Sequence, residues 1–175
     1  MNTHRLTRIA LFTAMAIILH IAEGMIPLPA AIMLPGVKIG FANIITIVAI
    51  ALLGFKDALI IVILRVTLSS LLTGMFFNIA FLMSFSGSLA AMLIMSFLYL
   101  LTQRQSKPPL GMVGISIVGA VVHNLAQLSV AALIIGTGGI FYYLPVMLVS
   151  SVLSGVLIGI LARLLLPRLD KALNI

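Results

Sequence analysis

The residues of this chain that could do chemistry are few, and most of them interrupt long apolar stretches. The 175-residue sequence has three carboxylates, three histidines and no cysteine. The carboxylates, Glu23, Asp57 and Asp170, are far apart in the sequence. Magnesium-dependent phosphoryl chemistry normally needs clustered carboxylates, and zinc sites need closely spaced His or Cys ligands. The sequence therefore predicts no metal site, no cofactor and no catalytic residues, and favours binding or transport over an enzyme.

Other activities are disfavoured by what the sequence lacks. There is no G-x-x-x-x-G-K-[ST] loop, so ATP hydrolysis by that route is not expected of this chain. The absence of cysteine excludes a disulfide framework and thiol chemistry. The net charge of +7 does not indicate a nucleic-acid partner, because the basic residues lie at the ends of apolar segments.

A second group of polar residues could bind a ligand. When the apolar segments are drawn as helices rising about 1.5 Å per residue, these residues fall in the same half of the bilayer. Hydrogen-bonding residues placed at random would not prefer one leaflet, so we predict a substrate-binding pocket in the outer half of the membrane. Its residues are Glu23, Lys38, Asn43, His123, Asn124 and Gln127.

Structural roles stay open for the same residues. Glu23 and Lys38 could form an ion pair that ties down the outer loop. The three polar residues within 123–127 could be hydrogen bonds between helices; His123 and Gln127, four apart, share a helix face. Arg65, near the middle of an apolar segment, could snorkel toward the cytoplasm or bind carbonyl groups at helix ends. Ionisable groups within a membrane usually face a cavity or a partner.

Long apolar segments must position these residues. Apolar residues make up 63% of the chain and charged residues 7%, with a mean hydropathy of +1.35. A soluble core of this size could not hide so much apolar surface, and lipid permits only helices or closed barrels. Continuous rather than alternating apolar runs indicate helices. The sequence predicts one all-α integral membrane domain, residues 1–175, with six transmembrane helices at about 6–22, 39–53, 58–72, 79–101, 112–135 and 142–166.

The distribution of basic residues predicts an orientation. With six crossings, only Lys38 lies on one side of the membrane, and the positive-inside rule makes the other side cytoplasmic. Both termini are then cytoplasmic. The eight basic residues on the cytoplasmic side are Arg5, Arg8, Lys56, Arg104, Lys107, Arg163, Arg168 and Lys171.

Small residues form a further pattern. Ala10 and Ala14 in the first apolar segment have small-xxx-small spacing, which lets helix backbones approach closely. Gly155 and Gly159 have the same spacing in the last segment, with Ser151 four residues earlier. For the last segment we expect packing within the protein itself.

Residues 34–44, Leu-Pro-Gly-Val-Lys-Ile-Gly-Phe-Ala-Asn-Ile, resemble the P-G-x-K-x-G-x-A-N signature of the Gx transporter family. Residues 53–58 and 64–66 continue the likeness. That family is similar to the substrate-binding S components of energy-coupling factor (ECF) importers, which are six-helix proteins of about this size. In S components an A-x-x-x-A pattern on the first helix docks on the transmembrane coupling subunit. The resemblance implies this role for Ala10 and Ala14.

Members of the same family are often labelled heptaprenyl diphosphate synthase component I. The usual prenyl transferases carry aspartate-rich motifs, whereas this chain has only Asp57 and Asp170. If the label reflects a prenyl link, we expect it to concern a bound lipid-like molecule rather than catalysis.

These observations predict an S-like component of a small-molecule importer in a prokaryotic cytoplasmic membrane, working with separate coupling and ATPase subunits. The pocket is expected among the first, fourth, fifth and sixth helices, capped by residues 24–38. A few polar groups among Met and Phe side chains would suit an amphipathic molecule with a small polar head. Two alternatives stay open: a non-catalytic membrane subunit of a prenyl diphosphate or quinone pathway, and a stand-alone secondary carrier.

Overall fold

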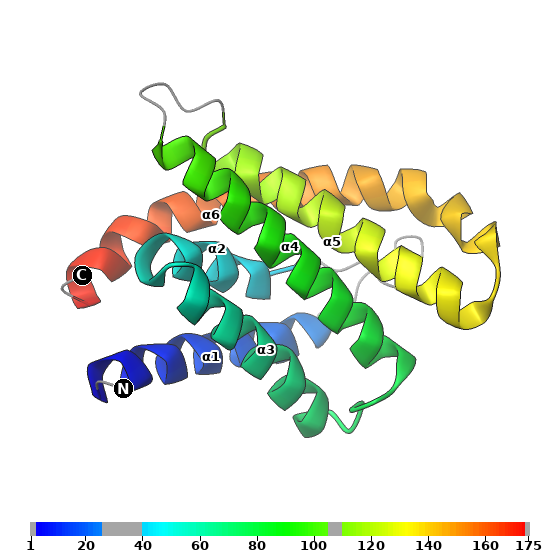
Figure 1. Cartoon of the computed structure of the whole chain (residues 1–175), viewed down its shortest axis with the longest axis horizontal. Helices are drawn as coiled ribbons and strands as arrows, with labels where there is room; N and C mark the ends of the chain where they lie inside the picture. Colours follow the sequence, from blue (N-terminus) through cyan, green and yellow to red (C-terminus); the bar gives the residue numbers. More distant parts are fainter. Residues whose placement is uncertain (1–2, 26–39, 105–109, 174–175) are drawn as a thin grey trace.

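The computed structural model of the protein describes residues 3–25, 40–104 and 110–173. Within these ranges every regular element is helical, and Figure 1 shows their arrangement. The prediction of an all-α chain with six helices is confirmed for these residues. In chain order the elements are α1 (Thr3–Gly24), α2 (Ala42–Leu53), α3 (Phe55–Leu72), α4 (Ile79–Gln103), α5 (Met112–Ile135), the short 3₁₀ helix η2 (Gly138–Tyr143) and α6 (Leu144–Leu173).

The predicted helix boundaries are within a few residues of the observed ones, except at the end of α6. We expected this helix to end at about residue 166. Pro167 follows, and proline lacks an N–H group and disfavours a helix interior. The helix instead continues to Leu173. Leu166, Leu169 and Leu173 pack against the hydrophobic core, and Arg8 Nη2 donates a hydrogen bond to the carbonyl oxygen of Leu173 (3.1 Å). This tertiary packing outweighs the cost of the proline.

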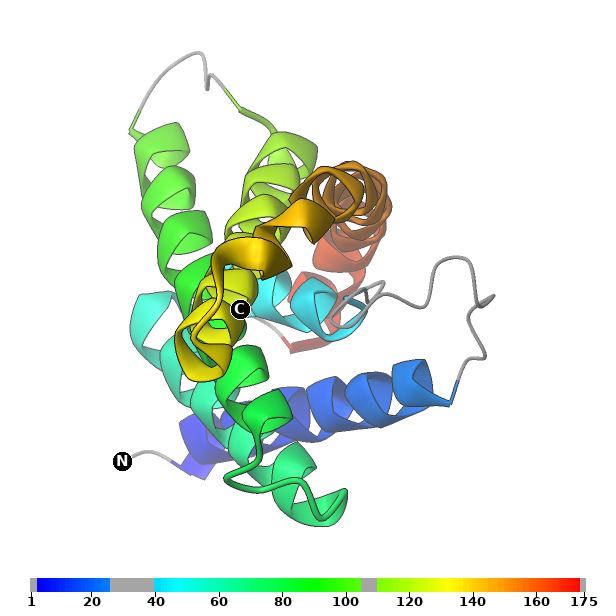
Figure 2. The same cartoon turned by 90° about the vertical axis from the view of Figure 1, so that its right-hand side faces the viewer.

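α2 is the central helix. It contacts α1, α3, α4 and α6, and two perpendicular views show it between α1 and α6 (Figures 1 and 2). Residues 42–50 are all buried, as expected for a helix that is apolar on every face. Its 12 residues are too few to span a hydrocarbon layer of about 30 Å. The N–H groups at its start therefore need partners within the protein.

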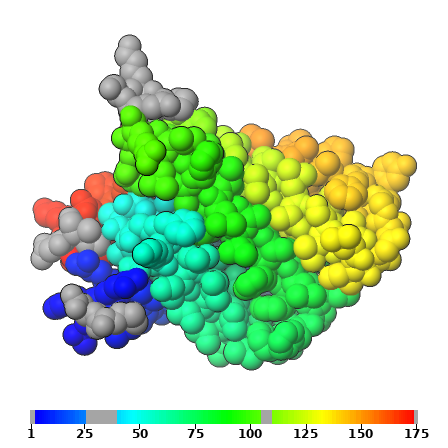
Figure 3. All heavy atoms as spheres, in the orientation of Figure 1, coloured from blue at the N-terminus to red at the C-terminus, as the bar shows by residue number. Residues whose placement is uncertain are grey.

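The outer surface of the described helices is rich in apolar side chains, as lipid contact requires. Large examples on five helices are Ile18, Leu72, Phe97, Leu133 and Leu153. Figure 3 shows one such face, on which α3, α4 and α5 are prominent. By length and composition, four segments could cross a membrane: Thr3–Gly24, Ile79–Gln103, Met112–Ile135 and Gly138–Leu173. The chain is a membrane-embedded helical protein.

The predicted count of six crossings is thus supported for four segments. α2 is short, and the 18 residues of α3 include Lys56, Asp57 and Arg65. Both ends of the described chain lie at one end of the molecule, where α3 also begins (Figure 1). Arg5 and Asp57 form a bidentate ion pair there, with Arg5 Nη2 2.5 Å from Asp57 Oδ1. This geometry suits an even number of crossings; the cytoplasmic orientation stays a prediction.

α5 and α6 pack with their backbones in close contact. A Cβ atom on Gly155 would lie 2.6 Å from the Cα of Ile117, and one on Gly159 would lie 2.5 Å from the Cα of Val113. Only glycine allows this approach. The prediction that the small residues of the last helix serve packing within the protein is confirmed.

Candidate functional site

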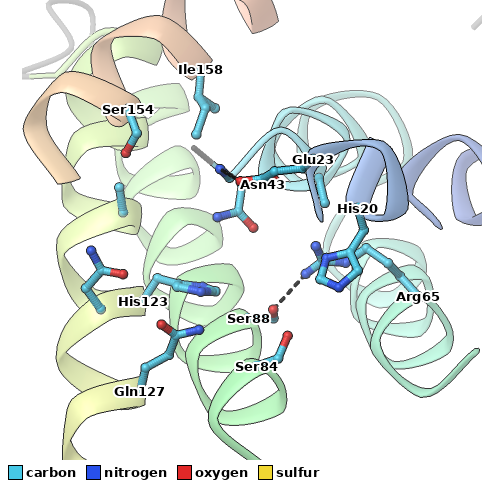
Figure 4. A pocket seen from close by; sticks show the side chains of 14 residues that line it. His20, Glu23, Asn43, Arg65, Ser84, Ser88, His123, Gln127, Ser154 and Ile158 are labelled. Atoms are coloured by element: carbon cyan, nitrogen blue, oxygen red, sulfur yellow. Dashed lines mark hydrogen bonds between the residues drawn. The ribbon is translucent and has the colours of Figure 1, made fainter. Parts of the chain in front are cut away.

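A polar cavity lies among the helices, and residues of all six α-helices line it (Figure 4). The centres of water-sized molecules can occupy about 30 Å³ of it, which is room for about two waters. In this conformation the cavity fits a small polar group. Its polar lining residues are His20, Glu23, Asn43, Arg65, Ser84, Ser88, His123, Asn124, Gln127 and Ser154.

Two expectations about this pocket are corrected. Residues of α2 and α3 line the cavity as well as those of the four predicted helices. We also expected Met and Phe side chains around few polar groups, but no Met or Phe is among the lining residues that lie within the described ranges. Phe12 and Met92 are fully buried in the hydrophobic core instead, and Met95 fills the space against Gly119. Helix packing uses these large side chains elsewhere.

Glu23 lies near the end of α1 and caps the buried start of α2. Its Oε1 accepts a hydrogen bond from the N–H of Gly40 (2.5 Å), and its Oε2 accepts one from the N–H of Phe41 (3.0 Å). Gly40 has a φ of +81°, which glycine adopts without strain. A carboxylate at a helix N-terminus satisfies free N–H groups and interacts favourably with the helix dipole. The other partner considered for Glu23, Lys38, lies outside the described residues.

Arg65 on α3 is the buried cation of the cavity, with 3% of its surface exposed. Its Nη2 donates a hydrogen bond to Ser88 Oγ on α4 (2.7 Å), while its Nε has no hydrogen-bond partner among the described residues. Within the described chain, Arg5–Asp57 is the one ion pair closer than 4.0 Å, so Arg65 and Glu23 do not form one. The two structural roles considered for Arg65, snorkelling and binding carbonyl groups at helix ends, are not seen among the described residues, where the buried side chain donates to Ser88 instead.

α5 presents His123 and Gln127 to the cavity, in agreement with their four-residue spacing. Both side chains lie across the cavity from His20 and Arg65 (Figure 4). Gln127 is 4% exposed, and its Oε1 has no hydrogen-bond partner among the described residues. Gly87 of α4 packs directly against the Gln127 side chain, since a Cβ atom added to Gly87 would lie 2.7 Å from Gln127 Cγ. The close approach of α4 and α5 brings the serines of α4 to the same cavity.

Asn124 also lines the cavity, but its amide joins α5 to α6. Its Nδ2 donates hydrogen bonds to the carbonyl oxygen of Met147 (3.2 Å) and to Ser151 Oγ (2.7 Å). Ser151 donates in turn to the same carbonyl (2.6 Å). This arrangement matches the alternative in which a polar residue is a hydrogen bond between helices.

The structure brings five of the six predicted site residues to one cavity: Glu23, Asn43, His123, Asn124 and Gln127. Their role in binding a substrate stays a prediction. Arg65 was weighed as structural, and the residues that we did not predict are His20, Ser84, Ser88 and Ser154. Helical spacing could have indicated most of them, because His20 is three residues from Glu23, and Ser84 and Ser88 are four apart.

Ala10 and Ala14 lie on the exposed face of α1. The opposite face contributes Ile9, Phe12 and Ala16 to the hydrophobic core. Packing within the described chain therefore does not explain this pair of small residues, in contrast to Gly155 and Gly159 of α6.

The described residues include no group of three or more His, Asp or Glu side chains that could hold a metal ion. The cavity offers a guanidinium, two imidazoles, amides and hydroxyls, which can bind and orient a ligand. Fold and site define a class of protein: a helical membrane protein with a polar cavity among its helices. A family model described as heptaprenyl diphosphate synthase component I matches residues 12–165, and the chain belongs to this family. Comparisons with curated proteins and with solved structures find no match.

Proposed function

We propose that this protein is the substrate-binding, S-like component of a small-molecule importer in a prokaryotic cytoplasmic membrane. The observation that carries the proposal is the cavity, which gathers polar side chains from all six helices of an apolar chain. Polar groups inside a membrane protein are costly and usually mark a ligand or ion path. A protein that served only as an anchor would not need such a cavity.

In this proposal the protein captures its solute from outside and depends on other subunits for energy. A coupling subunit would dock on the exposed face of α1 at Ala10 and Ala14, where small side chains allow a partner helix to approach. The ATPase subunits would be separate proteins.

We further propose that the chain has no catalysis of its own. Glu23 is engaged by the start of α2, and Asp57 is paired with Arg5 at one end of the molecule. No described carboxylate is left to hold a catalytic Mg²⁺ in the cavity. The purified chain is expected to release no diphosphate from isoprenoid diphosphates with Mg²⁺. Robust turnover that Asp57→Asn abolishes would contradict this.

The family description favours a second function, that of a non-catalytic membrane subunit in a prenyl diphosphate or quinone pathway. A soluble prenyl transferase would then be the partner. The third possibility, a stand-alone secondary carrier, is disfavoured because Glu23, the one carboxylate at the cavity, accepts two backbone hydrogen bonds and is poorly placed to couple proton movement.

Purification of the tagged protein at its natural abundance distinguishes these functions. We expect coupling and ATPase subunits to co-purify and mass spectrometry to find a small molecule retained by the protein. Capture of a prenyl transferase in place of ATPase subunits would support the second function. Uptake by the chain alone in liposomes would support the carrier. Either of these results would overturn the importer proposal.

A further inference from the structure

We propose that the molecule bound in this cavity carries an acidic group, a carboxylate or a phosphate, and that Arg65 binds this group. The inference rests on the proposed function, since it names the substrate class of the same site. Its evidence is the difference between Glu23 and Arg65, the acidic and the basic side chain among the described residues that line the cavity.

The carboxylate of Glu23 already has hydrogen-bond partners within the protein. Both carboxylate oxygens of Glu23 accept backbone hydrogen bonds, at 2.5 and 3.0 Å. The positive end of the α2 dipole lies at the same place. Glu23 is 8% exposed, so solvent contributes little to its stabilisation. A ligand cation would have to compete with these contacts.

The positive charge of Arg65 has no such direct contact, because the carboxylate of Glu23 acts on it only from beyond 4.0 Å. Arg65 is 3% exposed and has no carboxylate within 4.0 Å among the described residues. Its Nε has no hydrogen-bond partner there, although a guanidinium has five N–H donors in a planar fork. A buried charge without a counter-ion in contact is costly, and the fork matches the geometry of a carboxylate or phosphate. An acidic ligand group would remove the cost.

Gln127 and the shape of the cavity agree with this inference. The Gln127 amide lies across the cavity from Arg65 and has an unpartnered Oε1 (Figure 4). Its amide nitrogen faces the middle of the cavity in Figure 4, and the N–H₂ donors of this group suit an anion. Room for about two waters matches a group of a few heavy atoms rather than a large apolar body.

The test uses the full-length protein in lipid nanodiscs and four probes: butyrate, butyramide, butylammonium and inorganic phosphate. Binding to the native state raises the unfolding temperature, which circular dichroism measures at constant ionic strength. We expect butyrate or phosphate to stabilise the wild-type protein, and the preferred one to identify the acidic group. Butyramide and butylammonium should have no effect. Arg65→Gln should weaken binding of the preferred acid about tenfold or more.

Arg104→Gln is the matched control, because it removes the same charge from an exposed position at the end of α4; it should respond as the wild type does. If Arg65→Gln does not fold, Arg65→Lys keeps the charge but loses the planar fork, and it should bind the acid several-fold more weakly. The inference is overturned if neither acid stabilises the wild type, if butyramide or butylammonium stabilises it as well, or if the Arg65 variants respond like the wild type. A retained neutral or cationic solute, with ATPase partners present, would overturn this inference while the importer function stands.

Discussion

The two sides of α5 use similar residues in different ways. On the side that faces α6, Gly159 of α6 allows the backbones of the two helices to come into contact. The amide of Asn124 on α5 donates to a carbonyl and a hydroxyl group of α6. Toward the cavity, the Gln127 amide is equally buried, yet its Oε1 has no partner. Two amides three residues apart thus have different surroundings.

The difference shows that the type of a polar residue in a membrane helix does not decide its role. An amide whose hydrogen bonds are satisfied by a neighbouring helix stabilises the fold. A buried amide oxygen without a partner adds no hydrogen bond to the fold, and we expect the side chain that carries it to serve the ligand instead. Variants on the two sides of α5, and on the outer face of α1, test this distinction.

The largest effect is expected at the contact between α5 and α6. In Gly159→Val the new side chain would collide with the Val113 backbone, so the helices must separate. We expect the free energy of unfolding to fall by about 2–3 kcal/mol. Gly114→Ala is the control, because a Cβ there meets only the flexible end of Leu110. Unfolding in mixed detergent micelles measures both, and equal stability of Gly159→Val and wild type would contradict the close contact.

A smaller loss is expected for Asn124→Ala, which removes the donor to Met147 and Ser151. Hydrogen bonds between membrane helices are worth about 1 kcal/mol, so stability should fall by about that amount. Ser129→Ala is the control, since Ser129 is exposed and donates to Leu125 of its own helix. The two variants compared in the same unfolding assay decide the point: equal losses would mean that the link between α5 and α6 adds nothing.

In contrast to Asn124→Ala, Gln127→Ala should lower ligand affinity more than it lowers stability, because no hydrogen bond to Oε1 is lost. Affinity for the preferred acidic probe should weaken by about 1–3 kcal/mol if the amide binds the ligand. His123→Ala is expected to weaken affinity similarly. Unchanged affinity in both variants, together with reduced thermal stability, would show that these residues join helices and that the ligand lies elsewhere.

The smallest effect on folding is expected for Ala14→Leu. This side chain is exposed, so the variant should unfold like the wild type and keep its ligand. It should nevertheless lose co-purification with the coupling subunit and lose uptake, because a bulky side chain holds a partner helix away. Ala80→Leu, the same change at an exposed position of α4, should assemble normally. Normal assembly of Ala14→Leu would rule out docking at this face.

Much of the site was predictable because helical spacing is a local property. His123 and Gln127 share a face whatever surrounds α5, and both line the cavity. Arg65 was harder, since its depth in an apolar segment suits snorkelling as well as burial. Ser88, which holds it, is 23 residues further along the chain. No pattern in the sequence indicates that pairing.

The sequence by itself determined the helices, the membrane as their surroundings and five of the polar residues that line the cavity. Apolar runs, glycines and polar interruptions act over short distances, so these features follow without knowledge of the fold. Only the tertiary structure decided that α6 continues through Pro167, that Glu23 caps α2, and that Asn124 is satisfied while no described carboxylate lies within 4.0 Å of Arg65. These outcomes depend on which distant segments approach one another, because a buried polar group is stabilised only by the partners that packing brings within reach.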